Sequence, residues 1–184
     1  AEKNQSSEAP ASSGSCSSKK AANLQKAVEL LRVAGDKGDI KSLVTLMLLR
    51  FDSDSTVYSP EEAQKLLDTV VNMKSGLGML RAAEILGDVE LYEAAAETNY
   101  PEALYQWASI LFDSNPDELD PKAVEMMYAS AKQGYKPAQY WAAQIEETLG
   151  KFDSMLQLYR DAASYPDPDQ HASFQLGNIY YNGL

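Results

Sequence analysis

The sequence predicts an all-α, right-handed solenoid built from antiparallel helix pairs. A six-residue motif that opens on a small residue recurs five times, at Ser42, Gly78, Ala103, Ala138 and Ala172, with spacings of 36, 25, 35 and 34 residues. Self-similarity at this period is typical of stacked repeat arrays. No segment alternates apolar and polar residues over six positions, so strands are not expected.

The first 18 residues predict a flexible tail. They are rich in Ser, Ala, Glu and Pro and lack a periodic apolar face. The single cysteine, Cys16, lies in this tail, which excludes an intrachain disulfide and favours a solvated thiol. The repeat array is expected to occupy residues 19–184. Because the chain stops half-way through a helix pair, we expect the array to be a fragment of a longer one.

Helical periodicity begins near Lys20. Ala27, Leu30, Leu31 and Ala34 follow the i, i+3, i+4, i+7 spacing that places side chains on one helix face. Gly38 then stands where a left-handed helix end is required. The next helix is predicted over residues 40–51.

Helix start signals recur further along the chain. Ser59-Pro60 and Asp120-Pro121 each combine a capping side chain with proline at the first helical position. Asp88 is expected to cap a short helix over residues 89–98. The sequence therefore predicts short helices joined by tight connections.

The ends and the packing positions of the repeats share small residues. Gly134 and Asn99 are expected to adopt the left-handed conformation that ends a helix. Small side chains let two helices approach closely. The positions expected to pack in this way are Ala103, Ala108, Ala138, Ala143, Ala172 and Gly177.

Two stretches carry a resemblance to a known family. Residues 120–143 read DPKAVEMMYASAKQGYKPAQYWAA, and the segment from Ala172 reads ASFQLGNIYYNGL. Both resemble Sel1-like repeats, relatives of the tetratricopeptide repeat, and the resemblance covers about residues 20–184. It implies a non-catalytic scaffold or adaptor. The unit at Gly78 is shorter than the family pattern, and the connections 52–59 and 113–120 lack the family's glycines.

The charge balance narrows the class of partner. The chain has 16 basic and 27 acidic residues and a formal net charge of −11, which disfavours nucleic acid and anionic membrane surfaces as partners. A basic protein would be steered toward it. No apolar run reaches the length of a membrane span, so direct membrane insertion is not expected. The compartment stays open, with an exported or lumenal one favoured over the cytoplasm.

Catalytic signals are scarce. The single histidine, His171, lacks partners at metal-binding spacing and is expected to be a partly exposed residue at a helix start. No glycine-rich phosphate loop and no nucleophile elbow occur. We therefore predict no enzyme activity, no cofactor and no metal site. The acidic stretch 113–120 is interpreted either as a solubilising loop or as a contact for a basic partner.

The binding face is expected on the first helix of each pair, along the concave side. Aligning the five motifs places Val44, Leu80, Tyr105, Tyr140 and Phe174 in one column. For this column, packing in the core is the favoured interpretation. A second column lies one helical turn further along the first helices, and its last members are Ser109, Gln144 and Asn178. These neutral polar side chains suit hydrogen bonding to an extended peptide. The alternative is that they form a solvated face. Trp141 replaces a glutamine of neighbouring units and is a candidate exposed anchor, or else packs on the tail or a loop.

The candidate protein-binding residues are therefore Tyr105, Ser109, Tyr140, Trp141, Gln144, Phe174 and Asn178. The predicted function is a scaffold that binds a protein or peptide through this face. The alternative is a structural array with no ligand of its own, which packs against other parts of its protein or self-associates through its C-terminal end.

Overall fold

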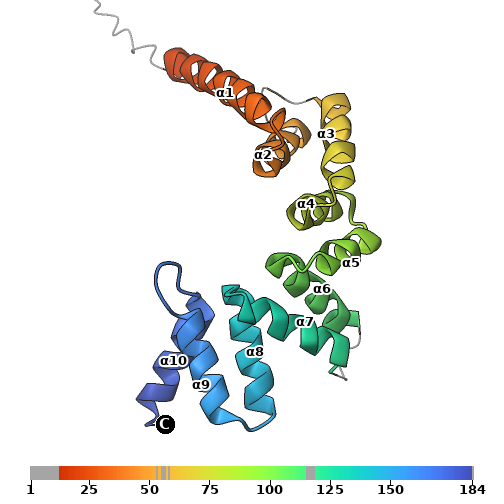
Figure 1. The fold of residues 1–184 in the computed structure, drawn as a ribbon. Helices are drawn as coiled ribbons and strands as arrows, with labels where there is room; N and C mark the ends of the chain where they lie inside the picture. Colours follow the sequence, from red (N-terminus) through yellow and green to blue (C-terminus); the bar gives the residue numbers. More distant parts are fainter. Residues whose placement is uncertain (1–12, 53, 55–56, 58, 115–118, 184) are drawn as a thin grey trace, which may run out of the picture. The chain divides into compact units, whose positions relative to one another are not determined.

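A computed structural model describes residues 13–52, 54, 57, 59–114 and 119–183. Within these residues the fold consists of ten α-helices without strands (Figure 1), as predicted. The helices are α1 (Ser13–Gly35), α2 (Ile40–Phe51), α3 (Pro60–Asn72), α4 (Gly76–Leu86), α5 (Val89–Glu97), α6 (Pro101–Ser114), α7 (Pro121–Lys132), α8 (Lys136–Thr148), α9 (Phe152–Ala162) and α10 (Gln170–Tyr181).

The chain divides into two compact units. Unit 1 covers residues 1–69 and holds α1, α2 and most of α3, whereas unit 2 covers residues 70–184 and holds α4 to α10. The expectation that residues 19–184 form one array stays a prediction.

The first helix starts earlier than the sequence suggests. The predicted tail was expected to run to residue 18, but residues 13–18 form the first turns of α1. Residues 1–12 lie outside the described part of the chain. A helix formed by the Ala- and Leu-rich residues that follow extends at low cost, because each added residue gains one hydrogen bond and serine is only mildly unfavourable in a helix.

Capping carboxylates mark the starts of several helices, and those of Asp88 and Asp120 were predicted. The Asp39 carboxylate accepts a hydrogen bond from the Ser42 amide at 2.8 Å at the start of α2. Asp88 and Asp120 cap α5 and α7 in the same way. These carboxylates satisfy amide groups that have no partner inside the helix.

Several helix ends carry a left-handed residue, and three of these were predicted. Gly38, Gly134 and Asn99 have φ angles of 88°, 84° and 60° and therefore lie in the left-handed region. Glycine adopts it without steric cost and asparagine more readily than most residues. The predicted left-handed ends are confirmed.

Unit 1 has an apolar core and a shared ion pair. Val28 of α1, Leu46 of α2 and Val57 of the following loop are buried together. The Glu62 carboxylate of α3 pairs with Arg32 and, at 3.1 Å, with the largely buried Arg50. These contacts join the three helices of the unit.

Unit 2 is built on fully buried small side chains. Ala103, Ala108, Ala138, Ala143 and Ala172 are all 0% exposed, which confirms five of the six predicted packing positions. The sixth, Gly177, is exposed, and a Cβ added there would meet no atom within 4 Å. That prediction was wrong because no described helix packs on this side of α10.

Consecutive helices of unit 2 pack as antiparallel pairs α4/α5, α6/α7 and α8/α9, followed by α10 (Figure 1). The connections from each second helix to the next first helix stack on one another. Ser130 Oγ donates to the Pro101 carbonyl at 2.6 Å, and Lys136 Nζ donates to Ser164 Oγ at 2.6 Å. The unit therefore has the predicted solenoid architecture.

Candidate protein-binding face

The candidate face consists of two groups of side chains. The tyrosine–carboxylate cluster holds Arg81, Glu84, Tyr100, Glu102, Tyr105 and Tyr135, and the α8 aromatic cluster holds Tyr140, Trp141, Gln144 and His171. We call the two together the first-helix face, because nearly all members lie on or beside α4, α6, α8 and α10.

Arg81 organises the tyrosine–carboxylate cluster. Its guanidinium donates to Glu84 on the same helix at 2.7 Å and to Glu102 on α6 at 2.8 Å, while its side chain is 25% exposed. Burial acts to lower the pKa of Arg81, but the hydrogen bonds to Glu84 and Glu102 outweigh it and raise that pKa. One cation therefore faces two carboxylates, and the cluster keeps a net negative charge.

Tyrosines surround this ion pair network. The Tyr105 and Tyr135 rings lie 5.4 Å apart at an angle of 57°, and the Tyr100 hydroxyl donates to Glu102 at 3.4 Å. Burial raises the pKa of Tyr135 to about 12, and the negative charge of Glu102 adds to this effect. Burial raises the pKa of Tyr100 too. Both phenols therefore stay protonated at neutral pH and keep a proton to donate.

Tyr140 is the centre of the α8 aromatic cluster. Its ring lies 6.1 Å from Trp141, 5.9 Å from Tyr159 and 5.6 Å from His171. Gln144 Nε2 donates to the Tyr140 hydroxyl at 2.8 Å. Because Tyr159 is only 1% exposed, it ties the cluster to the core. The indole of Trp141 is 43% exposed, so a large apolar surface is held in place beside water.

The residues expected to pack in one column behave differently along the chain. Val44 and Leu80 are buried, as the core interpretation predicts, and Tyr105 and Tyr140 are half-buried. Phe174 is 67% exposed, which contradicts the core interpretation at this position. Its side of α10 has no described helix against it.

The predicted polar column is partly engaged within the molecule. Ser109 Oγ donates to the Tyr105 carbonyl at 2.9 Å, and Gln144 donates to Tyr140 as described. Asn178 is half-buried on α10. Ser109 is thus less available to a peptide than its sequence position suggests, whereas Gln144 keeps its carbonyl oxygen as an acceptor.

Sequence reasoning missed Arg81, Glu102, Tyr100 and Tyr135. A signal for the two tyrosines was present, since each stands three residues before the motif of its unit, at Ala103 and Ala138. The pairing of Arg81 with Glu102 depends on how α4 meets α6, which the spacing alone does not give.

The described residues contain no group of three or more His, Cys, Asp or Glu side chains placed to hold a metal ion. No described helix is both long and apolar enough to span a bilayer.

Comparisons with known proteins give structural rather than sequence relatives. No protein-family profile matches the chain, and no curated protein matches its sequence. The crystal structure of c5321, a protective antigen of uropathogenic Escherichia coli with an SLR fold, superposes with a TM-score of 0.63 at 22% identity over 85% of this chain. The chain spans only 37% of the length of c5321.

Two further structures agree. A Sel1 repeat protein from Oxalobacter formigenes has a TM-score of 0.58 at 16% identity, covering 85% of this chain and 78% of that one. Immunity protein Pa5087 from Pseudomonas aeruginosa has a TM-score of 0.59 at 16% identity, covering 84% and 72%. These likenesses confirm that the chain has the Sel1-like repeat fold that the sequence predicted.

Proposed function

We propose that this chain is a non-catalytic scaffold that binds a protein or peptide through the first-helix face of unit 2. The observation that carries the proposal is Trp141, a 43% exposed indole held by Tyr140, whose ring in turn contacts the buried Tyr159. Rigid exposed aromatic side chains are the usual anchors of protein interfaces, because burying them on binding costs little conformational entropy. Helical repeat folds commonly serve in protein–protein interaction.

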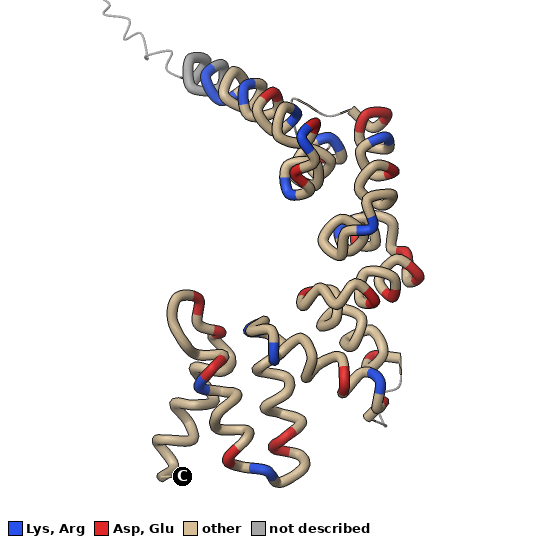
Figure 2. The backbone as a smooth tube through the Cα atoms, in the orientation of Figure 1, with Lys and Arg blue, Asp and Glu red and all other residues tan. Residues whose placement is uncertain are grey.

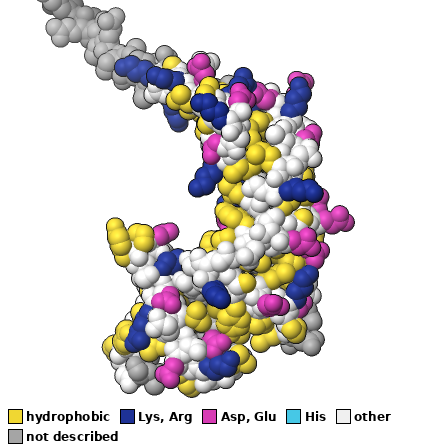
Figure 3. Space-filling view, viewed as in Figure 1, with side chains coloured by type: hydrophobic (Ala, Val, Ile, Leu, Met, Phe, Trp, Pro, Cys, Tyr) yellow, Lys and Arg dark blue, Asp and Glu magenta, His cyan; other side chains and the backbone are white. Residues whose placement is uncertain are grey.

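The charge of unit 2 supports a basic partner. Of the 16 basic and 27 acidic residues, 7 and 17 lie within residues 70–184, so this part of the chain carries a formal charge of −10 and residues 1–69 carry only −1. Acidic positions recur along α5 and α9 (Figure 2), and the surface of unit 2 intersperses acidic with hydrophobic side chains (Figure 3). Such a surface accelerates association with cationic segments in a salt-dependent manner.

The face offers matching chemistry for a basic peptide. The ring faces of Tyr105 and Tyr140 attract cations, and the surplus carboxylate charge around Arg81 adds to that attraction. Protonated tyrosine hydroxyls and the Gln144 carbonyl supply both donors and acceptors for a peptide backbone. The proposed ligand is therefore a Lys- or Arg-containing segment with apolar residues that cover Trp141.

Selection of peptides tests the proposal without knowledge of the natural partner. Random peptides displayed on phage would be selected on the immobilised chain, and the affinity of the selected peptides measured for three proteins: the unmodified chain, a variant with Trp141, Gln144 and Asn178 all changed to Ala, and Phe152→Ala. Phe152 is a matched control, since it is a 63% exposed aromatic residue on the second helix α9. Loss of a hot-spot tryptophan weakens binding by about 2 kcal/mol or more.

We expect the selected peptides to be rich in Lys and Arg and to lose affinity for the triple variant, while Phe152→Ala binds them normally. Equal affinity for all three proteins, with unchanged circular dichroism, would contradict the assignment of the first-helix face.

Exposed aromatic residues on α10 favour a second candidate function, self-association. Phe174, Tyr180 and Tyr181 are 67%, 53% and 90% exposed. Large exposed apolar side chains gathered on one helix can mark an interface. Light scattering over a concentration series, repeated with Phe174→Asp, tests this alternative. A dimer that the substitution abolishes supports it, and a monomer at all concentrations excludes it.

A further inference from the structure

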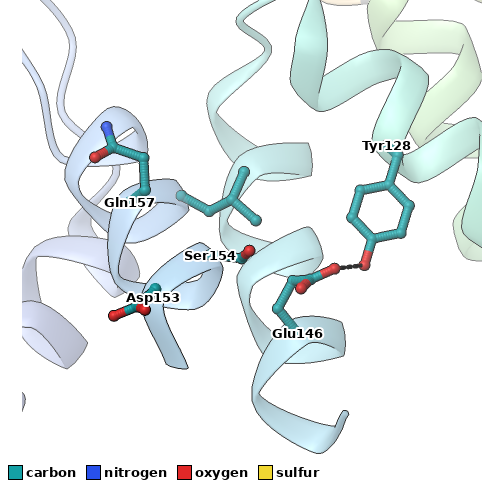
Figure 4. Close-up of a pocket in the computed structure, with 6 residues that line it drawn as sticks. Tyr128, Glu146, Asp153, Ser154 and Gln157 are labelled. Atoms are coloured by element: carbon teal, nitrogen blue, oxygen red, sulfur yellow. Dashed lines mark hydrogen bonds between the residues drawn. The ribbon is translucent and has the colours of Figure 1, made fainter. Parts of the chain in front are cut away.

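A second candidate site lies between the second helices α7 and α9 and the first helix α8, and it shares no residue with the first-helix face. An open depression of about 500 Å³ is lined by residues of α7, α8 and α9. Figure 4 shows the side chains around this gap: Tyr128 on α7, Glu146 on α8, and Asp153, Ser154 and Gln157 on α9, with Leu158 beside them. We call it the second-helix pocket.

Its central group is a buried carboxylate that is only partly compensated. The Glu146 side chain is 8% exposed, and Oε1 accepts a hydrogen bond from the Tyr128 hydroxyl. The nearest cation, Lys151 Nζ, lies 3.6 Å from the same oxygen and belongs to a side chain that is 58% exposed. Among the described residues Oε2 accepts no hydrogen bond, and it is not one of the buried side-chain atoms that lack a partner, so it is open to solvent and to a ligand. A cationic donor that reaches Oε2 would pair with this largely buried carboxylate.

The hydroxyl that contacts Glu146 is a neutral donor. Burial and the hydrogen bond to Glu146 raise the pKa of Tyr128 well above its ordinary value. The phenol therefore keeps its proton and donates it to the carboxylate in a hydrogen bond.

The other lining residues suit a planar cation. Asp153 adds a negative charge to the lining, Ser154 and Gln157 add neutral oxygen acceptors, and Leu158 and the Tyr128 ring add apolar surface. A guanidinium group presents five N–H donors in one plane and stacks on aromatic rings, so it can pair with Glu146 and pack against the Tyr128 ring together. An ammonium group lacks this planar fork.

We propose that the second-helix pocket binds an arginine side chain of a basic protein partner. The inference extends the proposed function, because it assigns a second contact to the same class of partner, and the formal charge of −10 on residues 70–184 supplies the complementary field. Lys151, which already reaches toward Glu146 from the neighbouring turn, is a weak competitor for the same carboxylate.

The test uses a small probe and the whole chain. N-acetyl-arginine amide would be titrated into labelled protein and followed by backbone amide chemical shifts, with N-acetyl-citrulline amide as the neutral probe of nearly the same shape. We expect saturable shifts confined to α7, α8 and α9 at roughly millimolar affinity, as befits a ligand of this size, and no saturable shift with citrulline. Equal responses to both probes, or none to arginine, would overturn the proposal.

Substitutions distinguish binding in the second-helix pocket from general attraction of the probe to an acidic surface. Glu146→Gln keeps an acceptor for Tyr128 while it removes the charge, and should weaken arginine binding about tenfold, because charge-assisted hydrogen bonds are roughly twice as strong as neutral ones. Asp153→Asn tests the pocket without touching the buried group. Lys151→Gln should strengthen binding by roughly two- to fivefold, since an exposed competitor is removed. Glu125→Gln, an exposed carboxylate on α7, is the matched control.

If Glu125→Gln weakens binding as much as Glu146→Gln, the probe senses only overall charge and the proposal fails. The triple variant of the first-helix face should bind the arginine probe normally. Failure of the pocket and failure of the first-helix face are therefore distinguishable, because each has its own ligand and its own variants.

Discussion

Replacing Gly76 with alanine tests the packing of α4 against the connection between α5 and α6. A Cβ at this position would overlap Thr98 Oγ1 and Tyr100 Cβ and would lie 3.1 Å from Tyr100 Cγ. Gly76 has no left-handed backbone to preserve, so lack of space is the sole obstacle. Relieving the overlap requires the connection to move, and overpacking of this kind costs about 1–3 kcal/mol.

The expected loss of stability can be compared with the effect of a second glycine substitution that should stabilise the protein. Gly177→Ala in α10 meets no atom within 4 Å and should stabilise the helix by about 0.5–1 kcal/mol through helix propensity. For a chain of this size a change of 1 kcal/mol moves the Tm by about 2–4 °C. Gly76→Ala should therefore lower the Tm by about 2–12 °C, while Gly177→Ala raises it slightly.

Thermal and urea unfolding followed by far-ultraviolet circular dichroism would measure both variants. If Gly76→Ala is as stable as the unmodified chain, or shifts in the same direction as Gly177→Ala, the close contact between α4 and the α5–α6 connection is not as described.

Two further predictions concern the core and the tyrosines. Met127 is 0% exposed, so Met127→Ala should lower the free energy of unfolding, measured in urea, by about 2–5 kcal/mol. Met126 is half-buried, so Met126→Ala should lower it by less. Equal losses would contradict the inward orientation of Met127. Tyr135, whose pKa is raised from 10.0 to about 12, contributes stability that is present below pH 10 and lost as pH rises to about 12. An ultraviolet absorbance titration of the chain minus that of Tyr135→Phe should show one tyrosine that ionises near pH 12, and ionisation near pH 10 would refute its burial beside Glu102.

The sequence predicts those parts of the fold that depend on local chemistry. Asp88 and Asp120 cap helices and Gly134 ends one because each acts on backbone groups within a few residues. The small side chains Ala138 and Ala172 are buried as expected, since close helix packing selects them wherever the motif repeats.

The site was predictable only in part. Trp141 stands out in the sequence because the neighbouring units hold Gln106 and Gln175 at its position. It is 43% exposed, which favours the exposed alternative over packing on the tail or a loop. Arg81 contacts Glu102, and Tyr128 contacts Glu146, across pairs of helices. These contacts depend on how each helix is rotated about its own axis, which the repeat spacing does not determine. The exposure of Phe174 was missed for a related reason, since burial depends on a neighbouring helix and not on the motif itself.

The most direct test of the proposed function is the footprint of a selected basic peptide on the chain, measured residue by residue from amide hydrogen exchange with and without peptide. If the first-helix face is the binding surface, protection should rise along α6, α8 and α10, around Tyr105, Tyr140 and Trp141. Protection confined to the second helices α5, α7 and α9, with the first helices unchanged, would contradict the account.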